Sequence, residues 1–170
     1  MASTYTLIQS QTLASSAASV TFSTIPSTYT DLVLKASARS TGSSYTLVLK
    51  LNGTTANYSD TFLQGSGSAA SSSAGSAQAA SYQYGGVDLS TYTANTFASA
   101  EIYIPSYTAS QNKPFSNFAV TETNATAAEI FAHASLWLNT AAITTVDFSL
   151  TGGNSFVTGS SFYLYGISNA

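Results

Sequence analysis

Hydrophobic and polar residues alternate one by one in several short stretches of the chain. The alternation is clearest in residues 31–40, 45–51, 97–105 and 129–139. A two-residue period places successive side chains on opposite faces of an extended backbone, so it predicts strands that each bury one face. Further stretches of this kind bring the expected number to about nine or ten strands, at 5–9, 19–23, 31–40, 45–51, 56–63, 97–105, 115–123, 129–139, 143–150 and 156–167.

Short polar connections predict hairpins between two pairs of these strands. The strands at 31–40 and 45–51 are joined by four residues, Thr-Gly-Ser-Ser. The last two strands are joined by residues 151–155, in which two glycines and an asparagine suit the positive φ angles of a tight or bulged turn. Asn52-Gly53, a strong signal for a tight turn, follows the fourth strand.

The residue types favour the same fold class. Threonine, tyrosine and valine suit a half-buried pleated surface, whereas Glu, Lys, Arg and Gln, which normally fill helix surfaces, are scarce. Regularly spaced short strands with polar turns are typical of a β-sandwich. We therefore predict an all-β, antiparallel, jelly-roll-like β-sandwich that forms a single domain over residues 1–170, which is long enough to bury a substantial core.

Two segments lack the strand pattern over much of their length. Residues 64–81 consist almost entirely of Ser, Ala and Gly, a composition typical of a flexible loop. Residues from 1 to about 18 form an N-terminal arm whose second half is again rich in Ser and Ala. Because a long ordered excursion from a compact domain is usually functional or docked, we expect the loop and the arm to lie on other subunits.

Hydroxyl groups rather than charges cover this chain. Only 6% of the residues are charged, against about 25% in an average soluble domain, and almost a third are Ser or Thr. A weakly charged surface gives little repulsion between copies of the chain and therefore favours a protein that is part of an assembly. A secreted β-domain with a Ser/Thr-rich surface remains the alternative.

The distribution of charge argues against several partners. The net charge is −3, and the four basic residues do not form the cluster that phosphate neutralisation requires, so no nucleic-acid partner is expected. Lys35, Arg39 and Lys50 fall on one polar side of the first predicted hairpin, where they form either an electropositive patch or, more simply, a soluble sheet face. No apolar run approaches a transmembrane length, and the N-terminus has no signal-peptide pattern, so no membrane partner is expected.

No local motif indicates catalysis or metal binding. The chain has no cysteine and one histidine, His133, which excludes a His-based or thiolate zinc site. It has no Gly-x-Ser-x-Gly motif, and we expect a structural role for His133. A glycosidase with a carboxylate pair stays open, although the carboxylates are dispersed, at Asp31, Asp60, Asp88, Glu101, Glu122, Glu129 and Asp147. We predict no enzymatic activity, catalytic residue, metal or cofactor.

Aromatic residues offer the best candidates for an interface. Eleven tyrosines and one tryptophan are present, and exposed aromatics on a sandwich either stack on sugar rings or anchor a protein contact. Most of them are expected to fill the sandwich. Tyr82 and Tyr84 beside the predicted loop, with Tyr5 and Leu7 in the arm, are the predicted subunit or capsid interface residues.

Several motifs together resemble small all-β virion proteins of tailed phages, especially aquatic phages that infect cyanobacteria. The motifs are IPSTYTDLVL (25–34), ARS (38–40), LNG (51–53) with YS (58–59), and GSSFYLYGI (159–167). The resemblance extends over most of the chain outside the Ser/Ala/Gly segment. These motifs are strand and turn patterns rather than catalytic signatures.

The resemblance implies a capsid cement, or decoration, protein. Such proteins bind as oligomers, often homotrimers, over junctions between major capsid protein subunits. The expected partners are therefore the major capsid protein and other copies of the chain, and the expected location is the outer surface of the capsid. A receptor- or glycan-binding module of a phage tail fibre is the alternative.

Overall fold

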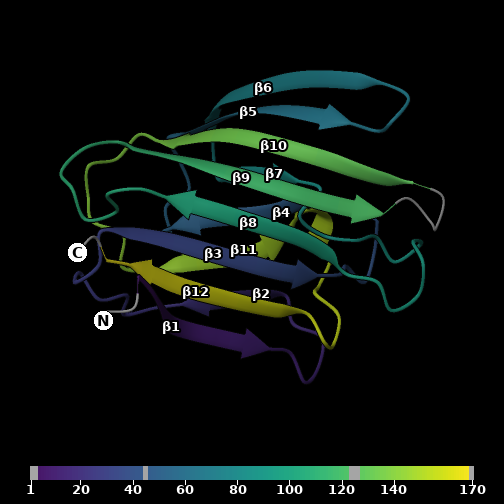
Figure 1. Cartoon of the computed structure of the whole chain (residues 1–170), viewed down its shortest axis with the longest axis horizontal. Helices are drawn as coiled ribbons and strands as arrows, with labels where there is room; N and C mark the ends of the chain where they lie inside the picture. The colour runs from purple at the N-terminus through teal and green to yellow at the C-terminus, as the bar shows by residue number, and fades with distance from the viewer. Residues whose placement is uncertain (1–3, 44–45, 123–126, 169–170) are drawn as a thin grey trace.

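Two antiparallel sheets packed face to face form the protein, as the computed structural model in Figure 1 shows. The structure describes residues 4–43, 46–122 and 127–168. Within these residues the helical element is a single 3-10 turn, Thr151–Gly153. The predicted all-β sandwich is confirmed.

The larger sheet has eight strands and the smaller one four. In spatial order, the eight-stranded sheet consists of β1 (Tyr5–Thr12), β12 (Ser161–Ile167), β3 (Asp31–Ala38), β8 (Ala98–Ile104), β9 (Lys113–Glu122), β10 (Ala128–Trp137), β5 (Tyr58–Gly65) and β6 (Ala70–Gln78). The four-stranded sheet consists of β2 (Ser19–Phe22), β11 (Val146–Leu150), β4 (Thr46–Leu51) and β7 (Ser81–Tyr84).

The strand order is that of a jelly roll with additions. Four pairs of neighbours are nested along the chain, with β5–β6 inside β4–β7, then β3–β8, then β2–β11. Successive pairs alternate between the two sheets, as in a jelly roll. β9 and β10 are inserted between β8 and β5, so that β8, β9 and β10 form a meander. β12 and β1 are added beside β3 on the other side of the large sheet.

The core lies between the sheets and follows the alternating pattern. In β8 and β9, every second residue is buried along the strand. The largest buried side chains include Trp137 and Tyr58, whose rings stack with their centroids 6.3 Å apart. Burying one large apolar side chain contributes about 1.5–3 kcal/mol, so this interior is the main source of stability.

Both predicted hairpins are wrong, although their strands exist. β3 belongs to the large sheet and β4 to the small one, and β11 and β12 are divided in the same way. Each connection therefore crosses from one sheet to the other. A strand with one buried face has the same alternation whether its chain neighbour pairs beside it or packs across the core, so the pattern could not distinguish these arrangements.

The predicted loop over 64–81 is wrong for most of its length. β5 continues to Gly65, residues 70–78 form β6, and β7 begins at Ser81, which raises the number of strands to twelve within the described residues. β6 pairs with β5 and buries almost none of its side chains. The backbone hydrogen bonds to β5 hold β6 in place. Amino-acid composition gives no sign of such bonds, because they do not depend on the side chains.

The N-terminal arm is also largely a strand of this chain. β1 pairs with β12, with a bulge between Leu7 and Gln9. β1 and β6 are therefore the two edge strands of the large sheet, and their contact with other subunits stays a prediction.

The predicted cluster of Lys35, Arg39 and Lys50 does not form. Lys35 lies on the exposed face of β3 and pairs with Glu101, and Lys50 lies in the other sheet opposite Asp147. Arg39 is buried. The separation follows from the failed hairpin, because the strands that carry these residues are in different sheets.

Candidate functional site

The outer face of the eight-stranded sheet is the most distinctive surface of the described chain. The four-stranded sheet packs behind the other face (Figure 1). Two groups of exposed or half-buried side chains lie on this open face, with Tyr163 and Tyr165 half-buried. We call Leu63, Phe118, Val120 and Ile130 the apolar patch, and Tyr5, Tyr103, Tyr163 and Tyr165 the tyrosine surface.

The apolar patch spans β5, β9 and β10. Phe118 and Leu63 flank Ala132 in one cross-strand row, and Val120 is directly opposite Ile130 in the next. The four patch side chains are 37–62% exposed. A contiguous apolar surface of this kind on a soluble protein indicates a binding site, whereas single exposed residues need no explanation.

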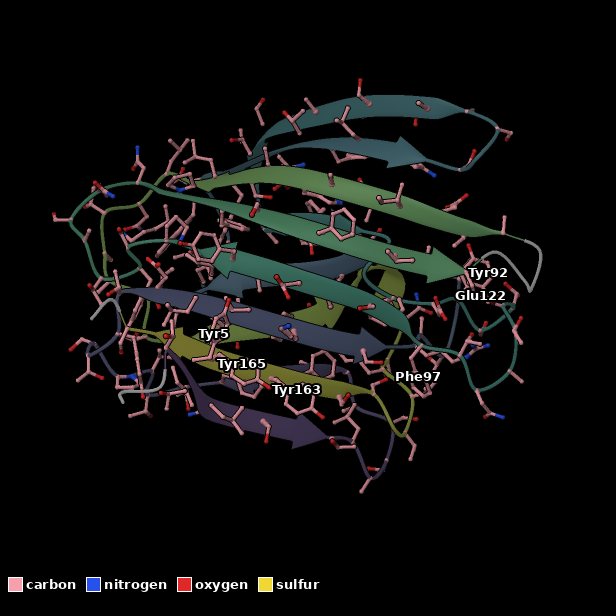
Figure 2. The ribbon with its side chains drawn as sticks, in the orientation of Figure 1. Tyr5, Tyr92, Phe97, Glu122, Tyr163 and Tyr165 are labelled. Atoms are coloured by element: carbon pink, nitrogen blue, oxygen red, sulfur yellow. The ribbon has the colours of Figure 1, made fainter. Side chains whose placement is uncertain are left out.

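The tyrosine surface covers the other half of the same face. Tyr163 and Tyr165 project from one side of β12, with ring centroids 6.4 Å apart and planes inclined by 22°. Tyr5 on β1 contacts Tyr165 edge to face, at a centroid distance of 6.3 Å. Figure 2 shows these three rings in a row on the face turned toward the viewer.

Fixed polar groups lie beside these rings. Across the sheet, Tyr163 is opposite Lys35, which is opposite Glu101. The Lys35 ammonium is 2.8 Å from a Glu101 carboxylate oxygen, and this contact raises the pKa of Lys35. Both side chains are about half exposed, so the pair contributes little to stability.

Tyr103 completes the tyrosine surface on β8. Its hydroxyl donates a hydrogen bond of 2.8 Å to Asp31, and this bond raises the pKa of Tyr103. Beside Tyr103 a cavity of about 300 Å³ opens on the sheet. It is lined by Tyr103, Pro105, Pro114, Phe115, Ser116, Ala134 and Ser135. The lining is mainly apolar, so the cavity suits a hydrophobic side chain rather than an ion.

The seven carboxylates are bonded to different partners across the described chain. Each has its own protein partner in the structure. These partners are Tyr103 and Ser106 for Asp31, Ser81 and Tyr82 for Asp60, Thr121 for Asp88, Lys35 for Glu101, Thr93 for Glu122, Gln64 for Glu129 and Thr21 for Asp147. These bonds hold strands and loops together, which is a structural use of the carboxylates.

His133 is buried among aromatic rings. Its Nε2 is 3.1 Å from the Tyr84 carbonyl oxygen, and the rings of Phe62, Tyr84 and Phe131 surround it. Burial lowers the pKa of His133. Among the described residues its Nδ1 is buried without a hydrogen-bond partner, and the ring is held by packing against the neighbouring rings.

Two buried cations organise loops. The Arg39 guanidinium donates to the carbonyls of Ser90, Tyr92, Thr93 and Thr96 at 2.7–3.1 Å. These residues lie at the end of the sandwich where Figure 2 labels Tyr92 and Phe97. The Lys113 ammonium donates to the carbonyls of Ala109 and Gln111, and burial lowers the pKa of Lys113.

The four predicted interface residues fall into two separate pairs. Tyr5 and Leu7 are about half exposed on edge strand β1, and Leu7 is opposite Tyr165. Tyr82 and Tyr84 lie on β7, an edge of the other sheet, where Tyr84 packs against the core with its ring 4.6 Å from that of Phe62.

Sequence reasoning did not select Tyr163, Tyr165 or the apolar patch. The alternating pattern placed these residues on defined strand faces, but it did not say which face is covered. In β10 the available signal was side-chain size, since the covered face carries Phe131 and Trp137 and the open face carries two alanines.

A cluster of metal ligands and a membrane-spanning helix are both absent from the described part of the chain. Residues 4–43, 46–122 and 127–168 contain no group of three or more His, Cys, Asp or Glu side chains that could hold a metal ion. In the same residues no helix is long and apolar enough to cross a membrane.

Comparisons of the chain with models of protein families, with curated proteins and with solved structures gave no match. The class that can be stated is therefore the one its own architecture defines, a jelly-roll-like β-sandwich with an enlarged outer sheet.

Proposed function

We propose that this chain is a non-enzymatic cement protein of a tailed-phage capsid, and that the apolar patch is its docking surface. The main support is the patch itself, four exposed apolar side chains that are neighbours on an open sheet. The resemblance of the strand and turn motifs to small phage virion proteins supports the same proposal.

The energetics favour binding through several copies. Complete burial of each patch side chain contributes about 1.5–3 kcal/mol. Association costs about 4–15 kcal/mol in lost freedom of motion, so a single patch of four partly exposed side chains binds weakly. A homotrimer presents three patches to neighbouring major capsid protein subunits, and each later contact is then effectively intramolecular.

The proposal is tested by replacing patch residues and measuring binding to capsids stripped of the protein. Ile130→Ser and Phe118→Ser are each expected to weaken binding at least about tenfold, equivalent to about 1.4 kcal/mol. Leu138→Ser is the matched control for Ile130→Ser, because Leu138 is 47% exposed and Ile130 44%. It follows the opposite end of β10, about 27 Å away at about 3.4 Å per residue. If Ile130→Ser and Phe118→Ser bind capsids as tightly as Leu138→Ser does, the patch is excluded as the docking surface.

Placement on the capsid has a separate test. A cement protein occurs in hundreds of copies per virion, whereas a receptor-binding module of a tail fibre occurs in tens at most. Quantitative gel analysis of purified particles measures the copy number, and imaging of the intact particle locates the protein. A low copy number with density at the tail would replace the capsid assignment with the fibre assignment.

A further inference from the structure

We infer that the tyrosine surface is a binding site for a neutral oligosaccharide. This site borders the apolar patch, because Glu101 is opposite Phe118, and it does not depend on where in a virion the protein resides. Four features of the surface support the inference: its rings, its polar groups, its charge balance and its width.

The rings offer the right kind of surface for sugar. One face of a pyranose ring presents C–H groups, which carry partial positive charge and are attracted to the negative face of an aromatic ring. Tyr163 and Tyr165, both half-buried, lie with their ring planes inclined by only 22° along β12, and the more exposed Tyr5 adds a third ring on β1, edge-on to Tyr165. The strand backbone holds the rings in this order, so little conformational entropy is lost when a ligand binds.

Hydrogen-bonding groups next to the rings suit sugar hydroxyls. Tyrosine hydroxyls donate and accept, the Lys35 ammonium donates, and the Glu101 carboxylate accepts. Lys35 and Glu101 lie in the same cross-strand row as Tyr163, and both are about half exposed. A hydroxyl group of a sugar can bond to either member of this ion pair, because each sugar hydroxyl is both donor and acceptor.

The charge balance selects a neutral ligand. Lys35 is paired with Glu101, and Asp31, bonded to Tyr103, adds a second acidic group on this side of the sheet. The other basic residues cannot contribute, because Arg39 and Lys113 are buried and Lys50 lies in the other sheet. A phosphorylated or sulfated ligand would therefore meet no unpaired cation on this surface.

The width of the surface suits an oligosaccharide rather than a single sugar. Tyr5, Tyr163, Lys35 and Tyr103 lie on four adjacent strands, β1, β12, β3 and β8. Strands about 4.8 Å apart make this surface about 14 Å across.

The test is calorimetric titration of the full chain with hexasaccharides. The neutral probes are β-1,4-linked glucose, β-1,3-linked glucose and β-1,4-linked N-acetylglucosamine, and a sulfated heparin hexasaccharide is the anionic comparison. We expect at least one neutral probe to bind with a Kd of about 1 mM or lower and the sulfated probe to bind more weakly. Failure of all three neutral probes, or preference for the sulfated one, would overturn the inference.

Variants connect any binding to these residues. Tyr163→Ala is expected to weaken binding of the neutral probe at least about tenfold, and Tyr5→Ala, at the exposed edge, tests the row independently of Tyr163. Leu63→Ala, in the part of the apolar patch three strands away from Glu101, should leave saccharide binding unchanged. Undiminished binding by both tyrosine variants would show that the sugar binds elsewhere. Capsid binding by Tyr163→Ala should stay normal, so failure of this inference is distinguishable from failure of the cement proposal.

Discussion

Individual polar residues have roles here that depend on partners far away in the chain. Arg39 follows a strand with the alternation of a half-exposed sheet, yet its guanidinium binds carbonyls more than fifty residues further on. The alternation in β10 does not show which of its faces is buried. In the structure His133 is on the buried face, enclosed by rings from three strands. Two predictions follow from these environments.

The first concerns pH and His133. Burial lowers its folded-state pKa below the unfolded value of about 6.5, so below that pH the unfolded chain binds a proton that the folded chain does not. Stability is therefore retained above pH 6.5 and falls as the pH decreases toward 5, by at most about 1.4 kcal/mol per pH unit.

Urea denaturation between pH 7.5 and 5 measures this loss of stability. His133 is the only histidine, and carboxylates titrate mainly below this range, while nearby Asp60 opposes the shift without reversing it. His133→Gln keeps a donor for the Tyr84 carbonyl and removes the titrating group, so its stability should be nearly constant over these pH values. An equal pH dependence in both proteins would refute the assignment.

The second prediction concerns Arg39. Arg39→Lys keeps the charge but cannot bond four carbonyls in the guanidinium's planar arrangement, so we expect a loss of about 2 kcal/mol. Faster hydrogen exchange should be concentrated in residues 89–97. Lys35→Met, at an exposed ion pair, is the control and should change stability by less than about 0.5 kcal/mol. A similar effect of the two substitutions would mean that the loop does not depend on the guanidinium.

At the scale of elements, ten strands could be predicted from alternation, and the pairing between them could not. β3 and β4 show the reason, because each needs only a buried face, and a neighbouring strand or the opposite sheet can provide the cover equally well. β6 shows the converse. Its nine residues bury almost nothing, so no hydrophobic signal exists, and the backbone of β5 alone gives it order.

Proline substitution distinguishes edge strands from central strands. Ala74→Pro affects β6, which pairs on one side only, whereas Ala100→Pro affects β8, which pairs with β3 and β9. Proline removes a ladder donor and is tolerated mainly at edges, so Ala100→Pro should cost several-fold more stability than Ala74→Pro. Thermal unfolding of both variants measures the difference. A larger loss from Ala74→Pro would imply that β6 is an essential part of the core sheet.

At the scale of the whole molecule, the proposed attachment to a capsid depends on apolar rather than ionic contacts. The four patch side chains are apolar, and the exposed Lys35–Glu101 ion pair borders the patch, because Glu101 is opposite Phe118. Salt screens interactions between exposed charges and leaves apolar burial largely intact. We therefore expect the protein to stay on particles washed in about 1 M NaCl, as measured by pelleting and gel analysis. Release of the protein by salt would contradict the apolar mechanism.

The sequence alone was sufficient for the class of the molecule, its strands and the chemistry it lacks, because alternation and composition are local properties. Tertiary structure decided which faces are covered, which strands pair and where exposed residues meet. Tyr5 and Tyr165 are 160 positions apart, yet they touch because β1 pairs with β12. Such contacts depend on pairing and on packing of one sheet over another, and no short stretch of the chain contains that information.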